Sequence, residues 1–164
     1  MQGLLKQLKR EATSNETHEI DLINLLQDIV NEHKNNLPNP VLTNSAEHKI
    51  IIHASQEQIQ SAITHLIKNA QEATSDDGYI KIDITESKHT VTIKISDNGS
   101  GMDQTFIKNS LFKPFSSTKG LSGMGIGVYQ CRQYIRSANG DIKVESQLNH
   151  GTTFTITLPI YKQE

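Results

Sequence analysis

The chain has no tryptophan, a single cysteine and few aromatic side chains, which make up 5% of its 164 residues. Because Cys131 has no second cysteine to pair with inside the chain, a disulfide cannot hold the fold together. A hydrophobic core can, since a domain of this length buries roughly two thirds of the surface that its unfolded chain exposes. We therefore expect one domain of the kind that folds in a reducing compartment.

Long apolar runs and a strong excess of one charge are also missing. No run approaches the roughly 20 residues that cross a bilayer, and the N-terminus lacks the apolar segment of a signal peptide. The formal net charge is -2 and the mean hydropathy is -0.47, so electrostatics gives no reason to expect nucleic acid or an anionic membrane as a partner. We expect a cytoplasmic domain without direct membrane contact, although a longer parent protein could be anchored in the inner membrane.

Apolar periodicity separates a short leading segment from a folded domain. Leu4, Leu5 and Leu8 share one helical face, and a polar stretch without periodicity follows them. We interpret residues 1–18 as the end of a preceding helix with its linker, and residues 19–164 as the domain itself.

Within the domain, spacing and capping residues predict three helices and six strands. Asp21 and Ser55 are the predicted N-caps, and Ser55 forms a capping box with Gln58. The helices are expected over residues 21–36, 55–74 and 126–140. The strands are expected over residues 41–43, 49–53, 79–87, 90–97, 141–147 and 151–160, with a short extended entry before the first helix.

Residues 103–122 show no periodicity and are expected to form a loop. A loop of about 20 residues is unusual in a compact domain and is usually functional. It contains the sequence LFKPFSSTK, in which Phe112 and Phe115 flank a proline. Two interpretations remain open: the rings dock a moving loop in one state, or they are plain anchors in the core.

The sequence HLIKN places His65 and Asn69 on one face of the second predicted helix, because residues four apart are neighbours on a helix. An asparagine oxygen is a hard, neutral ligand that suits Mg²⁺, which takes its other ligands from water and nucleotide phosphates. Taken alone, Asn69 is better interpreted as an ordinary residue of a helix surface.

Directly after a predicted strand, the sequence DNGSGM begins with Asp97. Its carboxylate can accept a hydrogen bond from an exocyclic amine, while Gly99 and Gly101 allow backbone to approach a flat ring. The alternative is an Asp-Asn-Gly turn without a ligand.

Glycines recur in the sequence STKGLSGMGIGVYQ, where Gly123, Gly125 and Gly127 are spaced by two and lead into a predicted helix. Such a turn can bind phosphate, since backbone N–H groups and the positive end of the helix converge there. Lys119 lies just before these glycines, where an ammonium group can reach a terminal phosphate. On its own the pattern also fits a flexible loop.

These motifs follow one another in a characteristic order: Asn on a helix, Asp-x-Gly-x-Gly after a strand, an aromatic loop, Gly-x-Gly-x-Gly before a helix, and a last strand beginning Gly-Thr. From Glu19 to Pro159 the chain closely resembles the catalytic and ATP-binding domain of sensor histidine kinases. That domain is part of the GHKL superfamily, which also holds gyrase, the MutL mismatch-repair ATPase and a heat-shock chaperone. The segments STKG and GMGIGVYQ most resemble kinases associated with exosortase (PEP-CTERM) surface-protein systems.

The resemblance implies a two-layer α/β sandwich of the Bergerat type, with a mixed, mostly antiparallel sheet, three helices on one face and an ATP lid. It implies that Asn69 binds Mg²⁺, that Asp97 recognises the adenine amine, and that Thr153 supports Asp97 through water. Phe112 and Phe115 would hold the lid. The residues expected to bind ATP are Asn69, Asp97, Gly99, Gly101, Met102, Phe112, Phe115, Thr118, Lys119, Gly123, Met124, Gly125, Ile126, Gly127 and Thr153.

His65 occupies the position at which the ATPases of this superfamily carry a glutamate that activates water. Because this glutamate is replaced by a histidine, direct hydrolysis of ATP is disfavoured. His65 is a candidate for polarising a reacting group or for a purely structural role. Residues Glu72 and Ala73 stand where some kinases have a basic or aromatic side chain, so Lys119 or Lys68 is expected to neutralise phosphate. We take Asn69, Lys119 and His65 as the candidate catalytic residues.

None of the seven histidines lies in a long amphipathic helix followed by an acidic residue, as a phosphoacceptor would. The resemblance therefore predicts a catalytic domain that transfers the γ-phosphate of ATP to a histidine on the dimerisation domain of its parent kinase, for relay to the receiver domain of a response regulator. Residues 1–18 would be the end of that dimerisation domain. A regulatory pseudokinase that binds nucleotide without turnover stays open, and a hydrolytic ATPase is a less favoured alternative.

Overall fold

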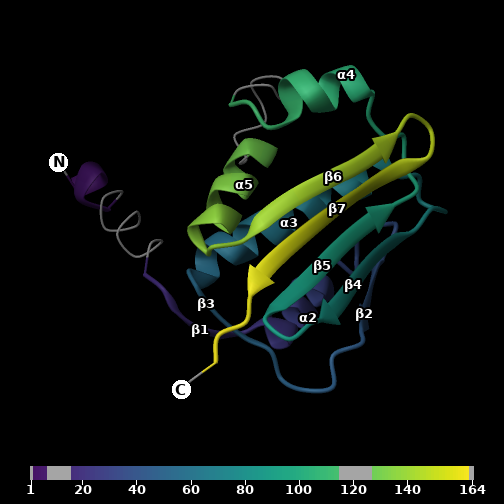
Figure 1. Cartoon of the computed structure of the whole chain (residues 1–164). Coiled ribbons are helices and arrows are strands. Elements are labelled where there is room, and N and C mark those ends of the chain that lie inside the picture. Colours follow the sequence, from purple (N-terminus) through teal and green to yellow (C-terminus); the bar gives the residue numbers. More distant parts are fainter. Residues whose placement is uncertain (1, 7–15, 115–126, 163–164) are drawn as a thin grey trace.

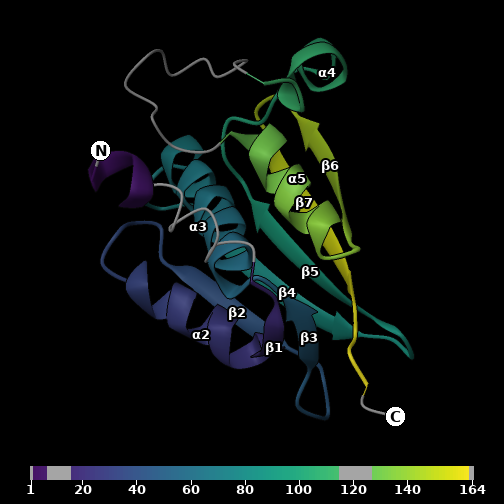
Figure 2. The same ribbon diagram turned by 90° about the vertical axis from the view of Figure 1, so that its left-hand side faces the viewer.

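The computed structural model describes residues 2–6, 16–114 and 127–162, and the described elements between His18 and Pro159 form two layers. One layer is a five-stranded sheet, and helices α2, α3 and α5 cover one face of it (Figure 1). Figure 2 shows the same helices side by side on one side of the strands. The elements are β1 (His18–Asp21), α2 (Leu22–Glu32), β2 (Pro40–Asn44), β3 (Ile51–Ala54), α3 (Gln56–Ala73), β4 (Ile80–Glu86), β5 (Thr90–Asp97), α4 (Gln104–Phe106), the π-helix η1 (Ile107–Leu111), α5 (Val128–Ser137), β6 (Asp141–Gln147) and β7 (Gly151–Pro159).

The sheet has the strand order β2-β4-β5-β7-β6. Strand β2 runs parallel to β4, and the other neighbours are antiparallel. Strands β1 and β3 form a separate antiparallel ribbon. The sheet is thus mixed and mostly antiparallel, so the predicted two-layer α/β fold is confirmed.

Alternation along the strands builds the core. Isoleucines at every second position of β4 and β5 face the helices and are buried, as are Phe154, Ile156 and Leu158 of β7. Helix α3 lies across them and buries the apolar face that its spacing predicts: Ile59, Ala62, Ile63, Leu66, Ile67 and Ala70. Each fully buried isoleucine contributes roughly 1.5–3 kcal/mol to the free energy of unfolding through the hydrophobic effect. The middle of the sheet is therefore stable and holds the ends of its strands in place.

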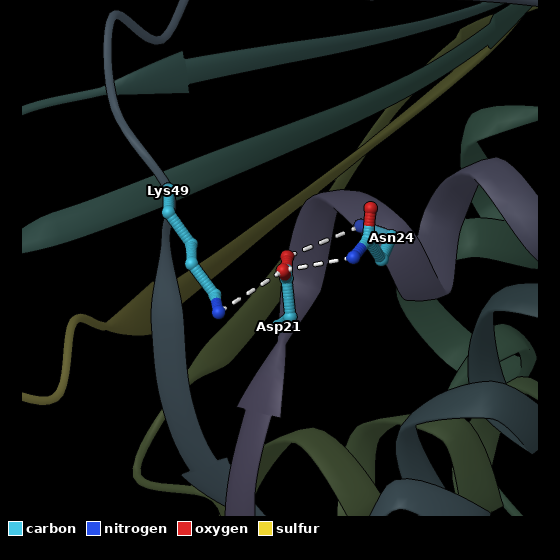
Figure 3. Close-up of polar contacts among 3 residues, drawn as sticks. All are labelled: Asp21, Asn24 and Lys49. Atoms are coloured by element: carbon cyan, nitrogen blue, oxygen red, sulfur yellow. Dashed lines mark hydrogen bonds and ion pairs between the residues drawn. The ribbon is translucent and has the colours of Figure 1, made fainter.

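Both predicted helix caps are present. The Asp21 carboxylate accepts hydrogen bonds from the backbone N–H of Asn24, at 3.3 Å, and from its side-chain amide, at 2.9 Å (Figure 3). Lys49 lies 3.7 Å from the same carboxylate and ties the start of α2 to the segment before β3. At the start of α3, Ser55 Oγ accepts a hydrogen bond from the N–H of Gln58 at 3.3 Å.

The predicted loop over residues 103–122 is wrong in its first part, because residues 104–111 form α4 and η1. Asp103 begins this segment by accepting hydrogen bonds from the N–H groups of Thr105, at 2.6 Å, and Phe106, at 3.4 Å. Leu111 is the one buried side chain of residues 104–111, so this segment needs no repeated apolar pattern and gives no periodic signal. Residues 115–122 of the predicted loop lie outside the described residues.

Within the three described ranges, no helix combines the length and the apolar character that crossing a membrane would require.

Candidate functional site

The end of α3 and the turn after β5 are in direct contact. The N–H of Ser100 donates to the carbonyl of Ala73 at 3.0 Å. A Cβ atom on Gly99 would collide with that same carbonyl group and with Thr74 Oγ1, so only glycine allows this approach. The contact joins the two elements that carry Asn69 and Asp97.

Asp97 is the last residue of β5 and is 8% exposed. Its Oδ1 accepts a hydrogen bond from the N–H of Gly99 at 2.9 Å, as in a turn begun by aspartate. Burial raises the pKa of the Asp97 carboxyl above its usual value, and hydrogen bonds from the N–H groups of Gly99 and Thr152 offset part of the rise. The site therefore contains a buried carboxylate, which favours a hydrogen-bond donor as its partner.

Thr153 does not contact Asp97, so the expected support of Asp97 by Thr153 is wrong. In the register of β5 and β7, Thr152 lies opposite Asp97 and Thr153 lies opposite Ser96. Successive side chains of a strand point to opposite faces, and the Thr153 hydroxyl donates to Ser96 Oγ at 3.1 Å on the face without helices. Thr152, which is buried, takes the expected place; the alternation that puts Phe154 and Ile156 in the core already indicated this.

Ser146 on β6 joins three chain segments beside Thr152. Its Oγ accepts a hydrogen bond from the N–H of Met102 at 2.8 Å and donates to the carbonyl of Gly151 at 2.9 Å. It also lies 2.8 Å from Thr152 Oγ1. Nothing in the sequence around Ser146 marks it as part of the site, because only the register of β6 with β7 brings it here.

Close packing of backbone explains the glycines of this turn. Gly101 has φ +68, and a Cβ atom there would collide with the carbonyl of Gln147. Gly151 has φ +107, and its Cβ would collide with the carbonyl of Asp97. In the described structure, the close approach that Gly99 and Gly101 allow is to the protein's own backbone, which holds Asp97, Met102 and the β6–β7 turn together.

His65 and Asn69 are adjacent on α3, and the Asn69 Nδ2 atom lies 3.1 Å from His65 Nε2. Both side chains are half-buried. Among the described residues, no three histidine, cysteine, aspartate or glutamate side chains are grouped so as to hold a metal ion. A cation at Asn69 would therefore take the amide oxygen as one ligand and complete its shell from a bound molecule.

Phe112 packs against the hydrophobic core and contacts Arg132 of α5. The guanidinium carbon lies 4.5 Å from the ring centre, and Nη2 donates to the carbonyl of Phe112 at 3.4 Å. Of the two interpretations of the aromatic pair, Phe112 fits the core anchor. The sequence did not lead us to expect a role for Arg132. A basic residue one turn into a helix that follows glycines could have indicated one.

Of the three glycines spaced by two before α5, the structure describes only the last, Gly127. Gly127 is the N-cap residue of α5, and no described atom lies within 4 Å of a Cβ placed there. The N-terminus of α5 has the N–H groups and the positive partial charge that favour an anion. The other predicted residues, Phe115, Thr118, Lys119, Gly123, Met124, Gly125 and Ile126, lie outside the described residues.

Comparison with known proteins gives one family match and many relatives. Residues 54–162 match the family described as histidine kinase-, DNA gyrase B-, and HSP90-like ATPase. Sporulation kinase D of Bacillus subtilis is 30% identical over 146 residues, which are 84% of this chain and 28% of the relative. The signal transduction histidine-protein kinase AtoS of Escherichia coli is 36% identical over 113 residues, which are 68% of this chain and 18% of the relative. The chain thus spans less than a third of the length of these relatives.

Solved structures give the same result. The catalytic domain of the histidine kinase ThkA superposes with a TM-score of 0.75 at 25% identity, covering 88% of this chain and 97% of that one. The mycobacterial sensor histidine kinase MprB, at 14% identity, shares the fold with a TM-score of 0.74 over 90% of this chain and 100% of its own. Nearly the whole of each solved chain is therefore matched by this one.

Proposed function

Because the chain belongs to the family of histidine kinase-, DNA gyrase B- and HSP90-like ATPases and holds an ATP-binding catalytic domain of the sensor histidine kinase type, we propose that it transfers the γ-phosphate of ATP to a histidine on a separate dimerisation domain. One observation carries this proposal. The end of α3, which carries Asn69, and the turn after β5, which carries Asp97, meet at the hydrogen bond from Ser100 to Ala73, and this contact supports one site shared by the two residues.

The Asp97 carboxylate accepts a hydrogen bond from the exocyclic amine of adenine. A buried carboxylate forms a strong, charge-assisted hydrogen bond to an N–H donor, and it has no donor of its own to offer when ionised. Thr152, whose N–H donates to this carboxylate, holds it from the β7 side. This pair therefore fixes the base end of the nucleotide.

The phosphates lie toward Asn69 and the N-terminus of α5. Backbone N–H groups after Gly127 donate to phosphate oxygens, and Lys119 adds a positive charge. The amide oxygen of Asn69 fits Mg²⁺, because this ion needs few protein ligands when phosphates supply the others. When bound, the ion neutralises phosphate charge, which together with positioning accounts for most of the catalysis in phosphoryl transfer.

The proposed partners follow from the same activity. The phosphoryl group passes to a histidine on the dimerisation domain of the parent kinase and then to the receiver domain of a response regulator. His65 stands in place of the glutamate that activates water in the related ATPases. Without that carboxylate, transfer of the phosphoryl group to a histidine is favoured over hydrolysis of ATP. We place this chemistry in the cytoplasm, where ATP is available.

Mixing the chain with the dimerisation domain of its parent and γ-labelled ATP tests the proposal. We expect acid-labile label on a histidine of the added domain, with little free phosphate. The variant Asn69→Ala should give no label, whereas Asp21→Ala, far from the motifs of the site, should label normally. Nucleotide binding without any labelled histidine would contradict a kinase and favour a regulatory module, and rapid release of free phosphate would favour a hydrolase.

A further inference from the structure

We infer that segment 160–162, which follows β7, fixes the orientation of the β1–β3 ribbon and thereby positions the catalytic domain for transfer to histidine. Tyr161 is the positioning residue of this segment, because its backbone N–H reaches the ribbon. The inference rests on the proposed function, in which the acceptor histidine belongs to a domain that precedes β1. It concerns the approach of the two domains and not the binding of nucleotide.

Segment 160–162 lies between the five-stranded sheet and the ribbon. The N–H of Ile160 donates to the carbonyl of His89, in the turn between β4 and β5, at 2.9 Å. The N–H of Tyr161 donates to the carbonyl of Ile51 in β3 at 2.7 Å. Successive N–H groups of an extended chain point to opposite sides, so these two consecutive residues join the two sheets. Figure 1 shows the chain after β7 running toward β1 and β3.

The carbonyl groups at the start of β3 alternate in the same way. The carbonyl of Ile50 accepts a hydrogen bond from the N–H of Leu22 at 3.0 Å, on the side of β1. The next carbonyl, that of Ile51, accepts from Tyr161 on the other side. Strand β3 therefore pairs with β1 along one edge and is contacted by segment 160–162 at the other. Among the described residues, Tyr161 makes the one backbone hydrogen bond between β3 and the chain after β7.

Side chains of the segment add contacts on both sides. The ring centres of Tyr161 and His53 are 5.3 Å apart, with 37° between the ring planes. Lys162 Nζ donates to the carbonyl of Lys88 at 3.0 Å, and Ile160 packs against the hydrophobic core. The segment is thus held by the β4–β5 turn on one side and by the ribbon on the other.

Two kinds of contact hold the ribbon, and they have different effects. Ile20, Ile52 and Ala54 are buried in the core, but the hydrophobic effect is non-directional. A hydrogen bond requires a defined distance and angle, so the bond from Tyr161 sets the angle between the ribbon and the sheet. Because β1 is the first strand, this angle sets the direction from which the preceding chain enters the domain.

The proposed nucleotide site lies at the other end of the same strands. In the β5–β7 register, Thr90 lies opposite Pro159, beside segment 160–162, whereas Asp97 lies opposite Thr152. The length of β5 separates these two ends by roughly 20 Å. Loss of the Tyr161 hydrogen bond should therefore leave nucleotide binding unchanged and act on transfer. Misplacement of reacting groups by about 1 Å costs up to about 100-fold in rate, so the effect is measurable.

Hydrogen exchange of the chain measures the hold on the ribbon directly. Tyr161→Pro removes the N–H donor, whereas Tyr161→Ala keeps it and removes only the ring, so the pair separates the hydrogen bond from the ring contact. We expect the amides of β1 and β3 to exchange faster in Tyr161→Pro than in Tyr161→Ala, with the amides of α3 unchanged. Unchanged exchange of β1 and β3 in folded Tyr161→Pro would overturn the inference.

The transfer reaction tests the positioning role. In the parent kinase, where the two domains are joined, Tyr161→Pro should lower the rate of histidine labelling roughly 10- to 100-fold, while calorimetry shows wild-type affinity for ADP. When the chain and the dimerisation domain are mixed as separate proteins, the variant should label at the wild-type rate, because the ribbon then joins nothing. Tyr161→Ala should stay close to the wild type in both assays.

Circular dichroism identifies variants that fail to fold. If Tyr161→Pro does not fold, a chain that ends at Ile160 removes the same donor without a proline ring. Faster exchange with undiminished transfer in the parent kinase, or an equal loss of transfer in both assays, would overturn the positioning role and leave the kinase activity standing. Absence of ADP binding and of labelled histidine with the folded wild type would instead overturn the proposed function.

Discussion

Asn69 donates a hydrogen bond from Nδ2 to Nε2 of His65, one helical turn earlier on α3, over 3.1 Å. For Nε2 to accept, the imidazole must be neutral and carry its proton on Nδ1. The amide nitrogen of Asn69 is then turned toward the ring, and Oδ1, the atom that suits Mg²⁺, is turned away from it. This geometry favours a role for His65 in orienting Asn69 over a role in polarising a reacting group.

His65→Leu removes the acceptor and leaves the Asn69 amide without this constraint on its orientation. We expect Mg²⁺ to strengthen ADP binding less in this variant than in the wild type, because Oδ1 is no longer held in place. Titrations with and without the metal measure the difference. His65→Gln, whose side-chain oxygen can accept the same hydrogen bond, should behave more like the wild type. A full effect of Mg²⁺ in His65→Leu would contradict the orienting role.

Asn69→Ala removes the proposed metal ligand itself. We expect ADP to bind without Mg²⁺ about as well as to the wild type, because the base end of the site is intact. Addition of Mg²⁺ should then bring little further gain, and transfer to histidine should stop. If Asn69→Ala labels the acceptor domain at the wild-type rate, Asn69 does not hold the ion.

Asp97→Asn replaces the acceptor of the adenine amine with a group that also carries donors. We expect ADP affinity to fall roughly 10- to 100-fold, the range for a hydrogen bond to a charged group. The wild type should bind ADP more weakly as the pH falls through the raised pKa of Asp97, since the protonated carboxyl loses acceptor capacity. The variant should lack this pH dependence, and calorimetry across the acidic range checks both statements.

Asp97 should make the stability of the unliganded domain depend on pH in the opposite direction to ADP binding: stability should fall as the pH rises. A carboxyl whose pKa is raised by folding stabilises the folded state below its unfolded value, near 3.8, and loses that contribution as the pH rises through the folded value. Urea unfolding of wild type and Asp97→Asn should therefore show the wild type losing stability relative to the variant as the pH rises. The reverse trend would show that hydrogen bonds to the carboxylate outweigh its burial.

Gly101→Ala and Gly127→Ala separate a structural glycine from a ligand-binding one. Gly101 has a positive φ and no room for a Cβ atom, so its replacement should destabilise the domain by at least about 1 kcal/mol. Gly127 has an ordinary φ of -88 and no described atom within 4 Å of a Cβ placed there, so its replacement should cost less stability than that of Gly101, only the difference between glycine and alanine at an N-cap, but should weaken ADP binding. Unchanged ADP affinity in Gly127→Ala would argue against phosphate at the start of α5.

Local patterns in the sequence predicted most of the fold. The isoleucines at alternate positions of β4 and β5 and the spacing on α3 predicted the buried faces, and Asp21 and Ser55 marked the starts of two helices. These features depend on residues within one element, which is why a single sequence contains them.

Features that depend on two elements were harder to predict. The position of Ser146 beside Thr152 follows from the register of β6 with β7, and the contact of Arg132 with Phe112 joins α5 to the segment after η1. The helical turn over residues 104–111 depends on one cap at Asp103 and one buried side chain, which leave no periodic pattern. The error at Thr153 was avoidable, since alternation along β7 places Thr152 on the face of Phe154.

Titration of the folded chain with ADP and Mg²⁺, followed by calorimetry, tests the central claim most directly. We predict weak binding of one nucleotide per chain, weakened roughly 10- to 100-fold in Asp97→Asn and retained in Asp21→Ala, whose lost helix cap costs about 1 kcal/mol of stability but lies outside the site. Absence of heat with wild-type protein that circular dichroism shows to be folded would contradict the nucleotide site built from Asn69 and Asp97.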